Sequence, residues 1–128
     1  GKDPGRELKT AISDNENTRL IENPSESKMN GLIRSAKVHA LYTSQATGIK
    51  IKLLKALCSG APIACNELMI EGTGLEEACS VANEPVEFVA LLSTLMTNTP
   101  DKSTANRKEL MQQFSYKSHV DIVRSFLQ

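Results

Sequence analysis

The sequence predicts a three-layer α/β domain, in which helices cover both faces of a parallel sheet of about four strands. Short apolar runs alternate with amphipathic helical patterns along the chain. These runs are apolar almost throughout, which is typical of strands buried on both faces. The chain has 128 residues, of which 40% are hydrophobic, so it can form one core of ordinary size. We therefore expect a single α/β domain over residues 1–128.

The amino-terminal part begins with a predicted helix followed by a predicted strand. Asp3 followed by Pro4 is typical of a helix start, and apolar residues at helical spacing extend the helix over residues 4–13. Residues 18–21, Thr-Arg-Leu-Ile, predict a strand that ends before Pro24, because proline cannot donate a hydrogen bond to a sheet.

A second helix and a second strand follow. Asn23 is the expected cap, because Glu26 stands three residues later in the arrangement of a capping box. The apolar stripe that predicts the helix consists of Met29, Leu32, Ile33 and Ala36. The apolar run 38–42 then predicts a buried strand.

The middle of the chain repeats this order. Gly60 is expected to end a helix, and strands are predicted at 61–65 and 79–82, with a turn-rich segment between them. Pro85 is expected to open another helix. The apolar side of the first helix is formed by Ile49, Leu53, Leu54 and Leu57, and the inward side of the second by Val86, Val89, Leu92 and Met96.

Two helical patterns close the chain, and we expect this tail to fold back over the sheet. The apolar positions of the first are Leu110, Met111 and Phe114. Ser115 is the expected cap of the second, whose stripe is formed by Val120, Val123, Phe126 and Leu127.

Composition narrows the classes of partner. Fifteen basic and fifteen acidic residues leave no net charge, so we expect neither nucleic acid nor an anionic membrane as partner. Cys58, Cys65 and Cys79 have no metal-ligand spacing, so we expect small core residues and no metal site. Because the apolar stretches are short, we expect no transmembrane segment and a cytoplasmic location.

The loop after the strand at 38–42 is the first candidate site. In parallel α/β sheets, ligands bind beyond the carboxyl ends of strands, where loops lead into helix N-termini. Gly48 permits close approach of a ligand, the amides that follow can hold a phosphate, and Lys52 lies one turn into the helix. The alternative is that Thr47 only caps the helix and that Lys50, Lys52 and Lys55 only face solvent.

The order of these parts resembles a known family. The segment NTRLIENPSESKMNGLIRSAKVHALYTSQATGIKIKLLKALCSGAPIACN is similar to the carboxyl-terminal, nucleotide-sugar-binding domain of "group 1" glycosyltransferases with the two-domain GT-B architecture. The likeness continues through LMIEGTGLEEACSVANEPVEFVALLSTLM and RKELMQQFSYKSHVDIVRSFL. It implies a Rossmann-like fold that forms half of a GT-B architecture. It also implies that the chain is a truncated carboxyl-terminal domain whose amino-terminal domain is missing.

The resemblance implies roles for some residues and denies them for others. In retaining members two glutamates flank the donor, but this chain has Thr47 and Lys55 at those places. An ammonium group cannot accept hydrogen bonds from ribose hydroxyls, so Lys55 cannot take over that role. Gly48, Ile49 and Lys52 match the diphosphate-binding positions. No catalytic residue is assigned.

Five further candidates for contacts with the donor are Ser44, Thr47, Lys55, Asn66 and Glu67. Lys55 is either a second cationic contact or a lysine that only faces solvent. Asn66 and Glu67 follow the strand at 61–65 and so lie at the ligand edge of the sheet, although residues of this kind also simply form turns. His39 and His119 are expected to be structural.

The resemblance thus implies a donor-binding domain of a glycosyltransferase, which transfers a sugar from a nucleotide-diphosphate sugar to an acceptor in polysaccharide or glycoconjugate synthesis. The nucleotide sugar is a substrate, and no cofactor is expected. The full-length protein would be cytoplasmic or peripheral to a membrane. The alternative is a non-catalytic interaction or regulatory domain that lost the donor-site glutamates. A flavodoxin-like binding domain and a nucleotide-sugar epimerase remain open.

Overall fold

The computed structural model describes residues 3–45, 50–98 and 112. The chain divides into two compact units, residues 1–35 and 36–128. The two helices predicted between residues 110 and 127 lie outside the described residues. Each unit is considered by itself below.

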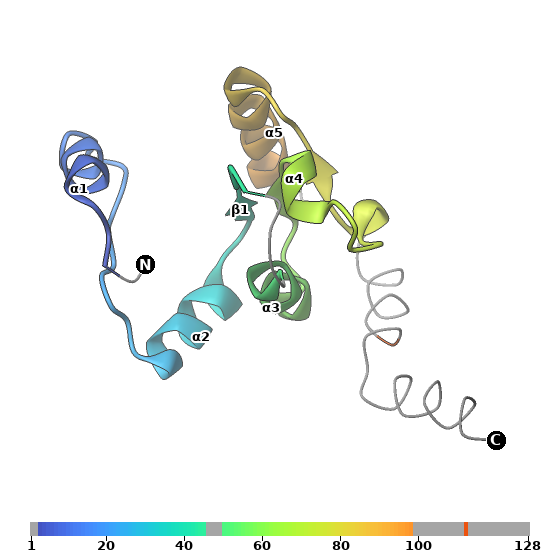
Figure 1. The fold of residues 1–128 in the computed structure, drawn as a ribbon, viewed down its shortest axis with the longest axis horizontal. Helices are drawn as coiled ribbons and strands as arrows, with labels where there is room; N and C mark the ends of the chain where they lie inside the picture. Colours follow the sequence, from blue (N-terminus) through green and yellow to red (C-terminus); the bar gives the residue numbers. More distant parts are fainter. Residues whose placement is uncertain (1–2, 46–49, 99–111, 113–128) are drawn as a thin grey trace. The chain divides into compact units, whose positions relative to one another are not determined.

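The second unit contains a parallel sheet of three strands (Figure 1). These are β1 (His39–Leu41), β2 (Ile63–Cys65) and β3 (Ser80–Val81), in the order β1-β2-β3. His39 lies opposite Ile63, and Cys65 lies opposite both Leu41 and Val81. The strands predicted at 38–42, 61–65 and 79–82 are therefore confirmed, as is the parallel α/β class.

The strand predicted at 18–21 is wrong, and the sheet of the described residues has three strands where about four were expected. Thr18–Ile21 takes part in no strand ladder among the residues that the structure describes. A run of apolar and β-branched residues fits a pleated surface, but it becomes a strand only where a neighbouring strand supplies hydrogen-bond partners.

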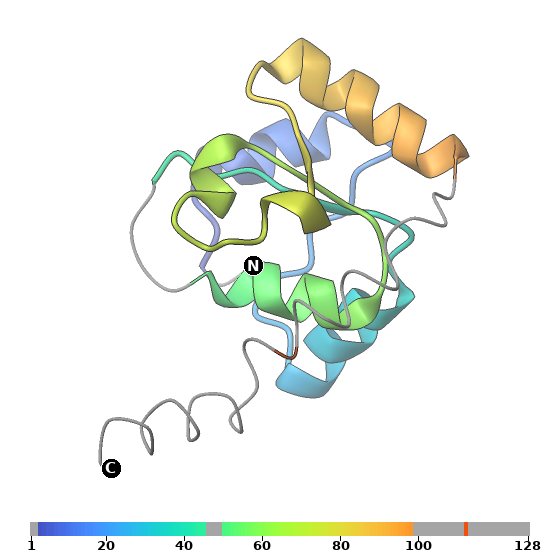
Figure 2. The same cartoon turned by 90° about the vertical axis from the view of Figure 1, so that its right-hand side faces the viewer.

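Helices cover both faces of this sheet, in agreement with the prediction (Figure 2). The central strand β2 is buried along its whole length, and its residues alternate between the two sides. On one side, α3 (Ile51–Ser59) packs through Leu53, Ala56 and Leu57 in a cluster that includes Ile63 and Cys65. On the other side, α5 (Pro85–Thr97) packs through Phe88 and Leu95 in a cluster that includes Ala64.

Two predicted helix boundaries are confirmed. Gly60 ends α3 with φ 82°, a left-handed conformation that is strained for other residues. Pro85 occupies the first turn of α5. The segment between β2 and β3, predicted to be rich in turns, also contains a short helix α4 (Glu67–Ile70) and a 3-10 turn η1 (Glu76–Ala78).

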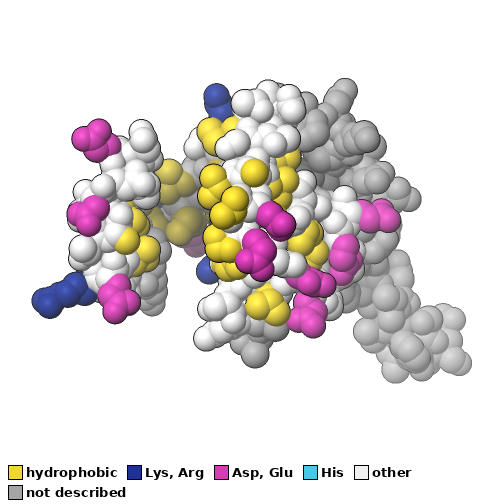
Figure 3. All heavy atoms as spheres, turned by 90° about the horizontal axis from the view of Figure 1, so that it is seen from above, with side chains coloured by type: hydrophobic (Ala, Val, Ile, Leu, Met, Phe, Trp, Pro, Cys, Tyr) yellow, Lys and Arg dark blue, Asp and Glu magenta, His cyan; other side chains and the backbone are white. Residues whose placement is uncertain are grey.

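The predicted inward face of α5 is wrong in three of its four positions. Val86, Val89 and Met96 are 82%, 62% and 65% exposed, and only Leu92 packs against the core. Apolar residues occur around most of α5, so spacing alone leaves two candidate faces. The structure buries the face of Phe88, whose ring meets Tyr42 edge to face with centroids 5.3 Å apart. Figure 3 shows hydrophobic and acidic side chains next to one another on the surface seen from above.

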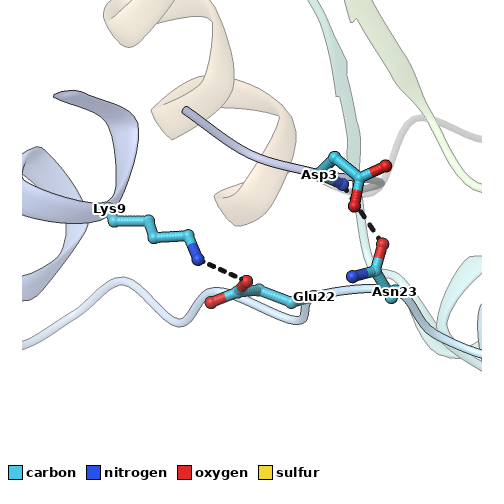
Figure 4. A network of polar contacts seen from close by, with 4 residues as sticks. All are labelled: Asp3, Lys9, Glu22 and Asn23. Atoms are coloured by element: carbon cyan, nitrogen blue, oxygen red, sulfur yellow. Dashed lines mark hydrogen bonds and ion pairs between the residues drawn. The ribbon is translucent and has the colours of Figure 1, made fainter. Parts of the chain in front are cut away.

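The first unit consists of α1 (Arg6–Ser13), α2 (Glu26–Ser35) and the segment between them, and neither helix contains a buried residue. Polar contacts connect its parts (Figure 4). The Asp3 amide donates to Asn23 Oδ1 over 3.1 Å, and Lys9 Nζ lies 2.7 Å from Glu22 Oε2. Both helices were predicted, and α2 begins later than expected.

The predicted capping box of α2 is wrong. The Lys28 amide donates to Ser25 Oγ over 3.2 Å, so Ser25 caps the helix. Asn23 has φ 43°, and its side-chain oxygen accepts from Asp3 instead. Because asparagine tolerates the left-handed region, Asn23 forms the turn before the helix.

Candidate functional site

Polar residues follow all three strands of the sheet. Thr43 comes two residues after β1, Asn66 comes directly after β2, and Asn83 comes two residues after β3. Because the strands are parallel, their carboxyl ends lie at one edge of the sheet, where ligands of such folds bind. These residues and the start of α3 form the candidate site.

The side chain of Asn66 ties the ends of β1 and β2 together. Its Nδ2 donates to the Thr43 carbonyl over 2.7 Å, and its Oδ1 accepts from the Thr43 amide over 3.1 Å. Asn66 is only 4% exposed. The side chain therefore acts mainly as a clamp, in accord with the turn-forming alternative, and retains one N–H and one lone pair.

Asn83 makes a second set of links across this edge, and sequence reasoning missed it. Its Oδ1 accepts from the Glu67 amide over 2.9 Å, and its Nδ2 donates to Glu67 Oε2 over 3.4 Å. The Tyr42 hydroxyl donates to the Asn83 carbonyl over 2.8 Å. The signal in the sequence was a polar residue directly after the strand predicted at 79–82, the same signal that singled out Asn66.

The loop after β1 is shaped by its own polar groups. Thr43 Oγ1 donates to the Gln45 carbonyl over 3.1 Å and accepts from the Gln45 amide over 3.2 Å. Lys50, which follows residues 46–49 in the sequence, donates from its Nζ to the same carbonyl over 3.4 Å. Ser44 is exposed on this loop. Thr47, Gly48 and Ile49 lie outside the described residues, so most of the predicted phosphate cradle does too.

The start of α3 combines positively charged lysines with main-chain N–H groups that no side chain caps. Lys50 is the cap residue, no side chain caps the helix, and the first turn has no acidic residue. Every other helix that the structure describes has a glutamate in its first turn. Lysines near a helix N-terminus are unfavourable by about 0.3–1 kcal/mol each, because the helix dipole is positive there. A bound anion would relieve this repulsion.

Lys52 and Lys55 are both exposed on α3. Neither ammonium group forms an ion pair within the described part of the chain. Lys52 is the second residue of the helix, whereas Lys55 lies one turn further along. An anion bound at the first turn of α3 would therefore lie closer to Lys52 than to Lys55.

His39 lies at the start of β1, away from this edge, and is structural as predicted. Its Nε2 is 2.6 Å from Ser59 Oγ. Ser59 Oγ already donates to the Ala56 carbonyl over 2.7 Å, so it accepts a hydrogen bond from His39. An imidazole nitrogen that donates cannot remove the serine proton, so the pair fastens α3 to β1. His119 lies outside the described residues.

The buried thiol of Cys65 is inert. A hydrogen bond with Cys79 raises the pKa of the Cys65 thiol above its usual range, and burial raises this pKa further. A thiol that stays protonated is neither a nucleophile nor a metal ligand. Cys65 and Cys79 pack in the core, as predicted, whereas Cys58 is exposed.

Two negative findings concern only the described residues. No three His, Cys, Asp or Glu side chains gather there in a way that could hold a metal ion. None of the helices described there has the length and apolarity to cross a bilayer. No protein-family model, curated protein or solved structure matches the chain.

Proposed function

We propose that the chain is the donor-binding domain of a glycosyltransferase, a Rossmann-like half of a GT-B architecture that holds the diphosphate of a nucleotide-diphosphate sugar. The start of α3 is the observation that supports this most. It lies one loop beyond the carboxyl end of β1 and carries Lys50 and Lys52 without any acidic residue in its first turn. A diphosphate supplies the negative charge that this helix end lacks.

In this role, the main-chain donors of the first turn and the Lys52 ammonium would bind the diphosphate oxygens. When the sugar is transferred, the nucleoside diphosphate leaves with increased negative charge, and fixed positive groups stabilise that charge. Asn66 and Asn83 would keep the loop ends in place through their contacts with Thr43 and Glu67. In a GT-B architecture the acceptor would be bound by the other domain.

A non-catalytic interaction domain is the second candidate. Lys55 stands where the resemblance places a carboxylate for the ribose, and it has no acceptor atom to offer. The exposed apolar face of α5 is also what an interaction domain would present. This function would require no nucleotide.

Calorimetric titration of the chain with UDP and with GDP at low salt separates the two functions. We expect one of them to bind, and Lys52→Ala to weaken binding by about 1–3 kcal/mol, or roughly 5- to 150-fold. Lys37→Ala is the matched control, because Lys37 is exposed and lies outside α3. It should leave affinity unchanged.

Absence of binding for both nucleotides, with no binding of ADP or CDP either, would favour the interaction domain. Equal affinity of the Lys52→Ala and Lys37→Ala variants would remove Lys52 from the site while leaving the nucleotide-binding function in place.

A further inference from the structure

Tyr42 presents a half-exposed aromatic ring at the ligand edge of the sheet. The residue directly follows β1 and is 52% exposed. Among the phenylalanine and tyrosine residues that the structure describes, the other one, Phe88, is buried. Exposed apolar residues are ordinary on a protein surface, but this ring lies at the edge where parallel α/β sheets bind ligands. It is therefore a candidate contact surface.

Two contacts hold the Tyr42 ring in one orientation. Its hydroxyl donates to the Asn83 carbonyl over 2.8 Å, which ties the end of β1 to the segment after β3. The Phe88 ring lies at 89° to the Tyr42 ring, with centroids 5.3 Å apart. In an edge-to-face pair one ring presents only its edge, so Phe88 leaves at least one face of Tyr42 uncovered. A ring that is already fixed loses little conformational entropy when a planar ligand stacks on it.

The same ring begins the loop that leads to the start of α3. Thr43 is the next residue, and its Oγ1 accepts from the Gln45 amide over 3.2 Å. Lys50, at the start of α3, donates from Nζ to the Gln45 carbonyl over 3.4 Å. Because Gln45 is three residues after Tyr42, their Cα atoms are at most about 11 Å apart. A ligand that joins a planar ring to an anionic group can therefore reach both Tyr42 and Lys50.

We propose that the base of the nucleoside diphosphate stacks on the Tyr42 ring while the start of α3 holds the diphosphate. This inference rests on the proposed function and adds to it a residue that binds the base. A base has two flat faces and polar edges, which suits an aromatic ring whose neighbours, Thr43 and Asn83, are polar. Stacking tolerates every base, so Tyr42 favours a nucleoside diphosphate over pyrophosphate without selecting the base.

Calorimetric titration with UDP, GDP and inorganic pyrophosphate tests this, because pyrophosphate carries the charge but no base. We expect the natural chain to bind UDP or GDP more tightly than pyrophosphate. Tyr42→Leu should weaken nucleotide binding by about 5- to 150-fold and leave pyrophosphate binding unchanged. Tyr42→Phe should keep most of the nucleotide affinity, because it retains the ring and loses only the hydrogen bond to Asn83. Met96→Ala is the control, since Met96 is exposed near the other end of α5, and should change neither affinity.

Nuclear magnetic resonance of the bound nucleotide gives a signal that a purely structural role of Tyr42 would not change. Protons of a base stacked on an aromatic ring are shielded by its ring current. We expect their signals to shift upfield on binding to the natural chain and to Tyr42→Phe, but not on binding to Tyr42→Leu. Circular dichroism checks that each variant is folded, and the natural chain and Tyr42→Phe decide the matter if Tyr42→Leu is not.

Several results would overturn the base site while leaving the proposed diphosphate site in place. These are equal affinity of the natural chain for pyrophosphate and the nucleotides, no upfield shift in the natural chain, and a Tyr42→Leu variant that binds nucleotide as tightly as the natural chain. Equal weakening of nucleotide and pyrophosphate binding by Tyr42→Leu would give Tyr42 a structural role only. If neither the nucleotides nor pyrophosphate bind, the proposed function fails and the base site fails with it.

Discussion

The two units of this chain show two ways of holding helices in place. Every residue that the structure buries, among those it describes, belongs to the second unit, and most pack in two clusters on either side of β2. In the first unit, α1 and α2 bury nothing, and exposed polar contacts join α1 and the residues before it to the segment that follows α1.

The comparison separates helix formation from burial. Both α1 and α3 have an apolar side, yet Leu8 of α1 is 50% exposed and Leu53 of α3 is fully buried. An amphipathic pattern gives a helix an apolar face, but that face stabilises the fold only when it packs against another apolar surface. Four predictions test this contrast.

The largest difference should appear when one leucine of each unit is truncated. Leu53→Ala should lower the free energy of unfolding by about 2–5 kcal/mol, because it removes buried methyl groups and leaves a cavity. Leu8→Ala should change it by less than about 0.5 kcal/mol. Urea denaturation followed by circular dichroism measures both. Similar losses for the two variants would show that Leu8 has a packing partner that its exposure conceals.

The next difference concerns two asparagines that connect distant parts of the chain. Asn66→Ala should cost about 2 kcal/mol of unfolding free energy, because the partly buried amide and carbonyl of Thr43 lose their partner. Asn23→Gly should cost less than about 1 kcal/mol. It removes an exposed hydrogen bond but keeps a residue that accepts a positive φ. The same denaturation experiment compares them, and an equal cost would contradict a special role for Asn66.

The third difference depends on pH and involves only the second unit. The folded protein raises the pKa of Cys65, so above about pH 8.5 the unfolded chain loses this proton while the folded chain keeps it. Stability should therefore fall as pH rises further, by up to about 1.4 kcal/mol per pH unit from this group. Below that pH both states are protonated, and the effect vanishes.

Denaturation at pH 7, 9 and 10 measures this slope. Cys65→Ala should show a smaller slope than the natural chain, whereas Cys58→Ala should retain it, because Cys58 is exposed. If the natural chain and Cys65→Ala lose stability in parallel, the shifted Cys65 pKa is not responsible.

The smallest effect is expected from the ion pair of Lys9 and Glu22. Both side chains are almost half exposed, at 47% and 42%, so water screens their attraction. A double-mutant cycle with Lys9→Ala and Glu22→Ala should give a coupling energy of about 0.2–1 kcal/mol, reduced in 1 M salt. A larger or salt-insensitive value would mean that the pair is more buried than in the structure.

The candidate site was predicted in part. The sequence placed Ser44, Lys52, Asn66 and Glu67 at the ends of predicted strands or helices, and the structure places them there. It did not reveal that Asn66 is used to hold Thr43, or that Asn83 binds Glu67. Such pairs join residues that are 16 to 23 positions apart. Local patterns contain no information about which distant group a side chain will meet.

By itself the sequence determined the order of the three strands, α3 and α5 in the second unit, the start of α5 at Pro85 and the end of α3 at Gly60. These follow from hydrophobic period, proline geometry and the conformational freedom of glycine, which act within a few residues. Only the tertiary structure decided which face of α5 is buried, and that residues 18–21 pair with no strand in the part of the chain that the structure describes. Both outcomes depend on which surface or strand lies opposite, and that partner comes from distant parts of the chain.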